Sequence, residues 1–122
     1  MSESNPTEAP QESQHVKELI EKNYEVEVLQ APLPVVVDFY SDANAPCTAL
    51  APRYAAVAGK FEGKIQFLKI RRLGNEGLCQ KLGVTSSPTL VFFKGGKELG
   101  ERLTGDDIKR TALKGQVEAL LK

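Results

Sequence analysis

Apolar positions along this chain follow two periodicities, one typical of strands and one of helices. Residues 35–40 (VVVDFY) are apolar on both alternating faces apart from Asp38, which is typical of a central strand covered on both sides. Apolar positions within residues 50–61 recur at helical spacing. They predict one face of a long helix that starts close to Asn44 and is kinked at Pro52. The apolar positions of this helix are Leu50, Tyr54, Val57, Ala58 and Phe61.

The remaining expected elements are short and have recognisable ends. They are a strand over 16–20, a helix over 23–30 capped by Asn23, a strand over 65–70, a helix over 76–82 stopped by Gly83, strands over 89–94 and 97–102, and a closing helix carrying Leu113, Val117 and Leu120. Gly95-Gly96 between the last two strands gives the clearest hairpin signal. The order β, α, β, α, β, α, β, β, α predicts a mixed sheet with helices on both sides.

Length and charge restrict the classes of function. The chain has 122 residues, 41% of them hydrophobic, enough for one core, and Lys plus Arg (16) balances Asp plus Glu (16). This balance gives no general attraction to nucleic acid or to an anionic membrane, so we expect the protein to bind neither. We expect protein partners that are recognised by a local surface. Residues 1–14 are polar and aperiodic, and we interpret them as a disordered tail before a domain at 15–122.

Location and redox state follow from what the chain carries. Its longest apolar runs are far shorter than the roughly 20 residues that cross a bilayer, and the N-terminus has no signal pattern, so we expect a cytoplasmic protein. Cys47 and Cys79 are then expected to be thiols. With one histidine, His15, there is no ligand set for zinc, and we predict no cofactor.

The segment from Asp38 to Cys47 (DFYSDANAPC) carries the main chemical signal. A central strand runs into a helix start here, a frame that suits thiols at positions 44 and 47, but position 44 is asparagine. Asparagine cannot attack a disulfide. It is among the best helix N-caps, worth about 1 kcal/mol, so the replacement converts a reactive helix end into a stable one.

Several separated motifs together resemble the thioredoxin family, from Val16 to the C-terminus. They are residues 37–41 (VDFYS), Pro46-Cys47 with 50–52 (LAP), Ser87-Pro88-Thr89, 94–97 (KGGK) and Gly105. The resemblance implies the thioredoxin fold, a three-layer α/β sandwich with a mixed sheet of four to five strands and helices on both faces. Where that family reads Trp-Cys-Gly-Pro-Cys, residues 43–47 read Ala-Asn-Ala-Pro-Cys.

The resemblance also implies roles for Cys47, Asp38 and Lys69. Cys47 matches the resolving cysteine, and it is either an exposed monothiol or a buried thiol packed as a small hydrophobe. Asp38 matches the proton acceptor for that cysteine. Burial should raise its pKa, and the alternative is a structural acid satisfied by backbone donors or by Lys69, which matches the lysine that neighbours the acid.

Ser87-Pro88 is better evidence for binding than for catalysis. The resemblance implies a cis Pro88, which leaves the preceding backbone free to pair with an extended segment of a partner. Asn44, Ala45 and Pro46 would lie on the same binding surface, and the alternative is a purely structural turn.

Three further residues carry weaker signals. We interpret Cys79 as core filler, on a helix across the sheet from Cys47 and too far away for a disulfide. Arg71 and Arg72 could hold a phosphate or an acidic partner, but a solvated charged edge is the preferred interpretation.

Two hypotheses about function remain. The first is monothiol exchange through Cys47 within cell redox homeostasis, with a small thiol or a thioredoxin reductase-like protein completing the cycle. The second is a non-catalytic binding module or assembly chaperone that uses the Pro88 groove and the Asn44 helix end. Under both hypotheses, we expect the protein to act as a monomer.

Overall fold

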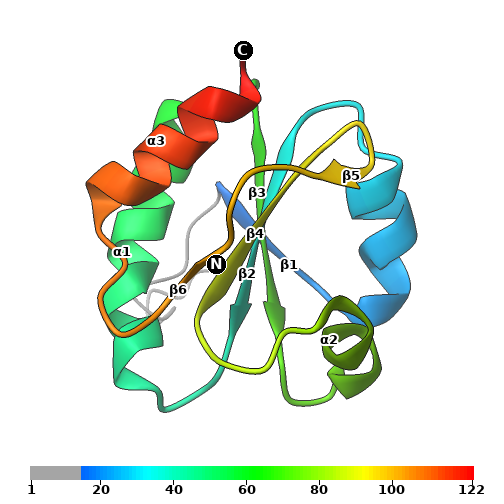
Figure 1. Cartoon of the computed structure of the whole chain (residues 1–122), viewed down its shortest axis with the longest axis vertical. Coiled ribbons are helices and arrows are strands. Elements are labelled where there is room, and N and C mark those ends of the chain that lie inside the picture. Colours follow the sequence, from blue (N-terminus) through cyan, green and yellow to red (C-terminus); the bar gives the residue numbers. More distant parts are fainter. Residues whose placement is uncertain (1–14) are drawn as a thin grey trace, which may run out of the picture.

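A mixed sheet lies between two helical layers in the computed structural model, which describes residues 15–122 (Figure 1). The predicted tail at 1–14 lies outside the described residues. The strands are β1 (Val16–Leu19), β2 (Val35–Tyr40), β3 (Gln66–Arg71), β4 (Thr89–Lys94), β5 (Lys97–Glu98) and β6 (Leu103–Thr104). The helices are the 3₁₀ turn η2 (Glu21–Asn23), the π-helix η3 (Glu25–Leu29), α1 (Ala45–Lys60), α2 (Glu76–Leu82) and α3 (Arg110–Leu120).

The sheet has the strand order β1-β3-β2-β4-β5, and β6 pairs with β4. Strands β1 and β2 both run parallel to β3, whereas β4 runs antiparallel to β2. In the register Asp38 faces Lys69 on β3 and Leu90 on β4, so it lies in the middle of the sheet. The predicted fold class is confirmed, with six strands in the described part of the chain instead of four to five.

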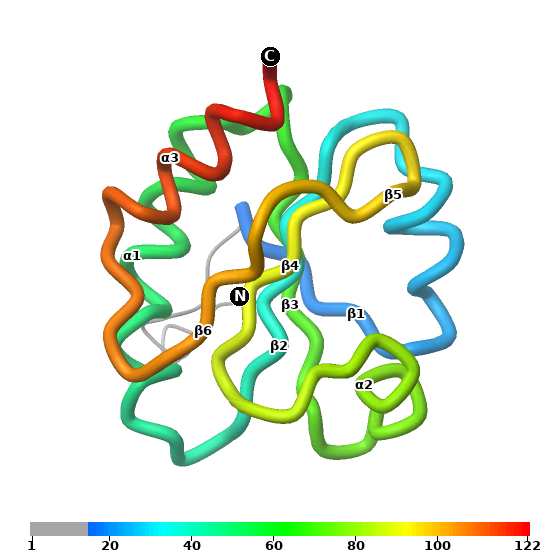
Figure 2. Tube along the Cα trace, viewed as in Figure 1, coloured from blue at the N-terminus to red at the C-terminus, as the bar shows by residue number. Residues whose placement is uncertain are grey.

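Side chains of β2 alternate between two halves of the core. Val36 packs with α1 and α3, whereas Val35, Val37 and Phe39 pack with η3 and α2, and all four are at most 1% exposed. The two views of the backbone show α1 beside α3 on one face of the sheet and α2 on the other (Figures 1 and 2). This double cover explains why β2 reads as apolar on both faces.

Tyr54 fixes α1 against the sheet. Its ring is 2% exposed, and its hydroxyl lies 2.6 Å from the carbonyl oxygen of Leu68 and 3.0 Å from that of Val36. A buried hydroxyl needs such partners, so this contact sets the position of α1 relative to β2 and β3. The helix continues from Ala45 to Lys60 although Pro52 lies inside it.

Two sequence predictions are wrong. The segment predicted as a helix over 23–30 is helical only as the π-helix η3, and Asn23 does not cap it: η2 ends at Asn23, whose side chain accepts a hydrogen bond from the Ile20 N–H at 3.3 Å. The wider π turn that follows buries Val28 in the core, and Pro32 and Pro34 leave no room to extend it. The strand predicted over 97–102 ends at Glu98, because the chain turns at Gly100, whose φ is +73°.

Candidate functional site

Three loops meet at the edge of the sheet where β2 and β3 end. The β2–β3 register places Tyr40 beside Arg71, and the Arg72 N–H donates to the Tyr40 carbonyl at 2.8 Å. Residues 41–44 lead from here into α1, residues 72–75 lead into α2, and residues 83–88 return to β4 (Figure 1, bottom of the view). The predicted site residues Asn44, Cys47, Ser87 and Pro88 belong to this edge.

Asn44 is the N-cap of α1. Its backbone is extended (φ −121°, ψ 116°), and its Oδ1 accepts a hydrogen bond from the Cys47 N–H at 2.9 Å. Pro46 lies in the first turn, where a missing N–H costs no helical hydrogen bond. Ala43, just before the cap, has φ +50°, a left-handed conformation that costs a residue with a Cβ about 1 kcal/mol or more. The Asn44 side chain thus satisfies a backbone N–H in the first turn of α1 that would otherwise have no hydrogen-bond partner in the helix.

Cys47 lies in the first turn of α1 and is 8% exposed. The Ser41 N–H lies 3.5 Å from its Sγ. Burial raises the pKa of the Cys47 thiol above its ordinary value, and the Ser41 N–H opposes this only in part. At neutral pH the sulfur is therefore mainly the protonated thiol, which is a poor nucleophile.

Asp38 is 6% exposed, in the centre of β2. Burial raises its pKa to about 7, with Lys69 acting in the opposite direction, as the sequence led us to expect. Its Oδ1 has no hydrogen-bond partner among the described residues, so backbone donors do not satisfy that oxygen. Asp38, Cys47 and Lys69 line one small hollow of about 140 Å³. The structure therefore brings together the three residues for which the family resemblance implies a chemical role.

Tyr40 and Arg71 form the outer rim of this region. The Lys69 ammonium lies 5.4 Å from the centre of the Tyr40 ring, and the Tyr40 hydroxyl donates to Glu18. Arg71 pairs with Asp42 across 3.2 Å and is exposed. The predicted solvated charged edge thus describes Arg71, whose charge is already balanced on the surface.

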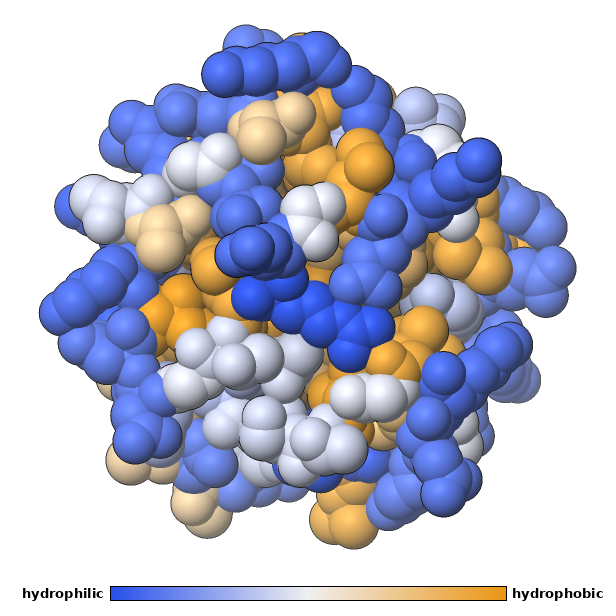
Figure 3. Space-filling view, in the orientation of Figure 1, coloured by the Kyte–Doolittle hydropathy of each residue, from blue (hydrophilic) through white to orange (hydrophobic). Residues whose placement is uncertain are grey.

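The loop before β4 contains a cis peptide bond between Ser87 and Pro88. Pro88 is buried and Ser87 half-buried, whereas Thr85 and Ser86 are exposed. The Thr89 hydroxyl donates to the Ser86 carbonyl at 2.8 Å, which ties the exposed part of the loop to the first residue of β4. Over this part of the molecule the surface is of intermediate hydropathy, drawn white, in the space-filling view (Figure 3).

Sequence reasoning missed a contact that joins all three loops. The Ser41 and Ser87 hydroxyl oxygens lie 2.6 Å apart, and Arg72 Nη1 donates to Ser87 Oγ at 2.9 Å. Arg72 is half-buried, so the prediction of a solvated edge is wrong for this residue. The parallel pairing of β2 with β3 places the residues after Tyr40 and Arg71 side by side, and no local sequence pattern indicates this contact.

Cys79 is 5% exposed and packs in the core half formed by η3 and α2, whereas Cys47 lies on α1. Burial raises the pKa of its thiol, and Arg72 nearby acts in the opposite direction. Both cysteines are free thiols. The position of Cys79 agrees with its interpretation as core filler.

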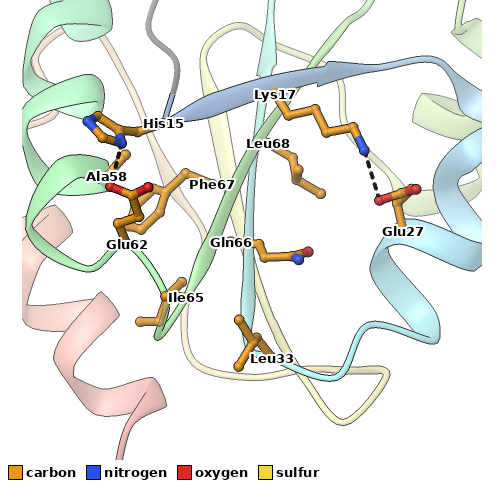
Figure 4. Close-up of a pocket in the computed structure, with 11 residues that line it drawn as sticks. His15, Lys17, Glu27, Leu33, Ala58, Glu62, Ile65, Gln66, Phe67 and Leu68 are labelled. Atoms are coloured by element: carbon orange, nitrogen blue, oxygen red, sulfur yellow. Dashed lines mark hydrogen bonds and ion pairs between the residues drawn. The ribbon is translucent and has the colours of Figure 1, made fainter.

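A second hollow, of about 300 Å³, is lined by residues of β1, the start of β3, and the C-terminal end of α1 (Figure 4). His15 lies 3.0 Å from Glu62 and Lys17 lies 3.3 Å from Glu27 at its margins. None of the predicted site residues lines it. Within residues 15–122, no group of three or more His, Cys, Asp and Glu side chains could hold a metal ion. No helix in this range is long and apolar enough to cross a membrane.

Fold and site together define an α/β protein with the architecture of thiol-disulfide redox proteins. The chain belongs to the thioredoxin family, because the family model described as Thioredoxin matches residues 15–119. The thioredoxin of Peptoclostridium acidaminophilum is 36% identical over 93 residues, covering 76% of this chain and 84% of that protein. The thioredoxin of Pseudomonas aeruginosa is 34% identical over 84 residues, covering 69% and 78%.

A solved structure agrees on the fold. The crystal structure of the Trx4 domain of ERdj5 superimposes with a TM-score of 0.76 over 89% of this chain and 97% of that domain, at 23% sequence identity. The predicted family and fold class are therefore confirmed.

Proposed function

We propose that this protein is a thioredoxin-family binding module that holds an extended segment of a partner protein beside Pro88 and does not reduce disulfides by the two-thiol route. One observation carries the proposal: the helix end where an attacking thiol would sit is occupied by the capping Asn44, and the remaining thiol is buried. A site with no exposed thiolate can still bind.

The proposed binding surface is formed by residues 85–87, of which Thr85 and Ser86 are exposed and Ser87 is half-buried, together with the start of α1. A partner strand would pair with the backbone before Pro88, and side chains at Asn44, Ala45 and Pro46 would contact its other edge. Ala45 is exposed, and Asn44 and Pro46 are half-buried, so this part of the surface is accessible. Main-chain hydrogen bonds would supply affinity, and neighbouring side chains would supply selectivity.

A peptide selection tests the proposal. The full chain is used to select from a random peptide library, and the selected peptide is titrated into ¹⁵N-labelled protein. We expect the largest amide shifts at residues 85–89 and 43–48, and no insulin reduction by the same protein. Cys47→Ser should bind the peptide within about twofold of wild type, because the buried thiol makes no contact with it. Shifts confined to other surfaces, or a Cys47→Ser variant that no longer binds, would contradict the proposal.

Monothiol exchange through Cys47 is the second candidate, favoured by the hollow that Cys47 shares with Asp38. In this reaction Asp38 takes the thiol proton and the Cys47 sulfur attacks a disulfide, forming a mixed disulfide and releasing one thiolate. An external thiol, or a thioredoxin reductase-like protein through its own thiol, then attacks the mixed disulfide and restores Cys47. Incubation of the Cys79→Ser variant with glutathione disulfide, read by intact mass, tests it. A glutathione adduct that forms at neutral pH and is lost in Asp38→Asn supports exchange.

We also propose that the protein acts as a cytoplasmic monomer. The bacterial thioredoxins among its relatives and its two free thiols support the cytoplasmic location. Light scattering after size exclusion tests the oligomeric state, and fractionation of cells that express the tagged chain tests the location.

A further inference from the structure

Arg72 is unlike the other half-buried arginines of the described residues. Arg53 pairs with Asp107 and Arg102 pairs with Glu98, each through a carboxylate. Arg72 forms no ion pair with any described carboxylate, and its Nε is buried without a hydrogen-bond partner. The Cys79 thiol also interacts with the Arg72 side chain, but a protonated thiol carries no negative charge. A guanidinium that is partly withdrawn from water without an anion is unfavourable unless something else supplies the negative charge.

The two serines beside Arg72 add a further donor. Arginine only donates, so Arg72 Nη1 occupies a lone pair of Ser87 Oγ. Ser41 and Ser87 carry two hydroxyl hydrogens, and the 2.6 Å contact between them uses one, whichever serine donates. The second hydroxyl hydrogen has no acceptor among the hydrogen bonds of the described residues. The cluster of Ser41, Arg72 and Ser87 therefore has more donors than acceptors.

This cluster lies at the proposed binding surface. Ser87 directly precedes Pro88, Ser41 belongs to the loop that leads to Asn44, and Arg72 connects both loops to the end of β3. A partner segment lying along residues 85–87 would pass next to the cluster.

We propose that Ser41, Arg72 and Ser87 form an acceptor-binding subsite that selects partner segments carrying an aspartate or glutamate side chain. This inference rests on the proposed function, since it names the chemistry that the Pro88 surface prefers. A carboxylate matches one guanidinium and one spare hydroxyl in charge and geometry. A phosphate would bring a second negative charge close to Asp42, which follows Ser41 in the chain, and to Glu76, which lines one hollow together with Arg72.

The test compares acidic and neutral forms of one peptide. A random library is selected on the full-length wild-type chain, and the preferred peptide is then measured by fluorescence anisotropy in its original form and with each acidic residue replaced by its amide. We expect acidic residues to be enriched at one position, and the amide at that position to weaken binding by about tenfold or more. Arg72→Leu should remove that difference, whereas Arg71→Leu, at a neighbouring arginine already paired with Asp42, should retain it.

The possible outcomes separate the subsite from the binding surface. Peptides that shift the amides of residues 85–89 but bind equally well in acidic and neutral forms would overturn the subsite and leave the proposed function standing. An acid preference that survives in Arg72→Leu would also overturn it. Failure of every selected peptide to shift those amides would reject the proposed function and the subsite with it. If Arg72→Leu does not fold, Arg72→Lys decides: it should retain the preference for acid but with weaker binding, because lysine lacks the planar fork.

Discussion

The Oδ1 atom of Asn44 accepts a hydrogen bond from the backbone N–H of Cys47 at 2.9 Å. The side chain of Asn44 thus satisfies the backbone N–H of Cys47, the residue of this helix end that carries a thiol. The same contact starts α1 at a fixed point, and α1 in turn holds Cys47 inside the protein. The cap at Asn44 and the burial of Cys47 therefore belong to the same helix end.

Replacing Asn44 with alanine should lower the free energy of unfolding by about 1 kcal/mol, because the Cys47 N–H loses its side-chain acceptor. Asn44→Asp is the matched control, since aspartate keeps the acceptor and its charge suits a helix N-terminus. Urea denaturation of the three proteins measures the effect. Equal stability of Asn44→Ala and wild type would show that the cap does not stabilise this helix.

Replacing Asn44 with cysteine should create disulfide reductase activity. The introduced sulfur would lie at the N-terminus of α1, where free N–H groups and the helix dipole favour a thiolate, with Cys47 three residues further on to resolve the mixed disulfide. Reduction of insulin by dithiothreitol, with and without the variant, measures the gain. Asn44→Ser and the double variant Asn44→Cys/Cys47→Ser are controls that should remain inactive. An inactive Asn44→Cys variant would contradict this prediction, and would mean that Ala43 or Ala45 also prevents disulfide reduction.

The sequence was sufficient for the parts of the fold with long, regular patterns. The buried run at 35–40, the helical repeat after Asn44 and the glycine that ends α2 all have local signals, and the structure agrees with each. The segment η2–η3 has too few residues for the spacing of Tyr24 and Val28 to separate an α-helix from a π turn. The two residues of β6 are too few for any strand pattern.

The site divides in the same way. Asn44, Cys47 and Asp38 belong to one continuous segment, so a motif could indicate them together. The cluster of Ser41, Arg72 and Ser87 joins residues that lie 46 and 15 positions apart in sequence, and its hydrogen bonds depend on the packing of three loops. No local pattern reports such a contact. The sequence also does not distinguish a half-buried arginine such as Arg72 from an exposed charged residue after a strand.

Asp38 should make stability depend on pH. Its pKa is about 7 in the folded protein and 3.8 by its ordinary value, so the folded state binds the proton more tightly. Stability should therefore fall as the pH rises from about 4 to about 7, by up to about 4 kcal/mol, and level off above that. Asn at this position does not ionise, so the stability of Asp38→Asn relative to wild type should rise over the same range.

Urea denaturation at a series of pH values from 4 to 8 measures the difference in free energy of unfolding between Asp38→Asn and wild type. The contributions of the other titrating groups cancel in this difference. Asp107→Asn is the control, because Asp107 is exposed and its ion pairs lower the pKa of its carboxyl. Its stability relative to wild type should change little above pH 5. A pH-independent difference for Asp38→Asn would mean that the Asp38 carboxyl keeps its ordinary pKa.

Alkylation of Cys47 separates the two proposed functions. In a Cys79→Ser background, iodoacetamide should label Cys47 more slowly than a free thiol, and the midpoint of the rate against pH should lie above the ordinary thiol pKa of about 8.5. Adding urea should bring the rate to that of the free thiol, which shows that burial was the cause. The Cys47→Ser variant, which reports on Cys79, is the matched control. Rapid labelling at neutral pH with a midpoint below about 8.5 would mean that the loop opens to form a thiolate, and would favour monothiol exchange over binding alone.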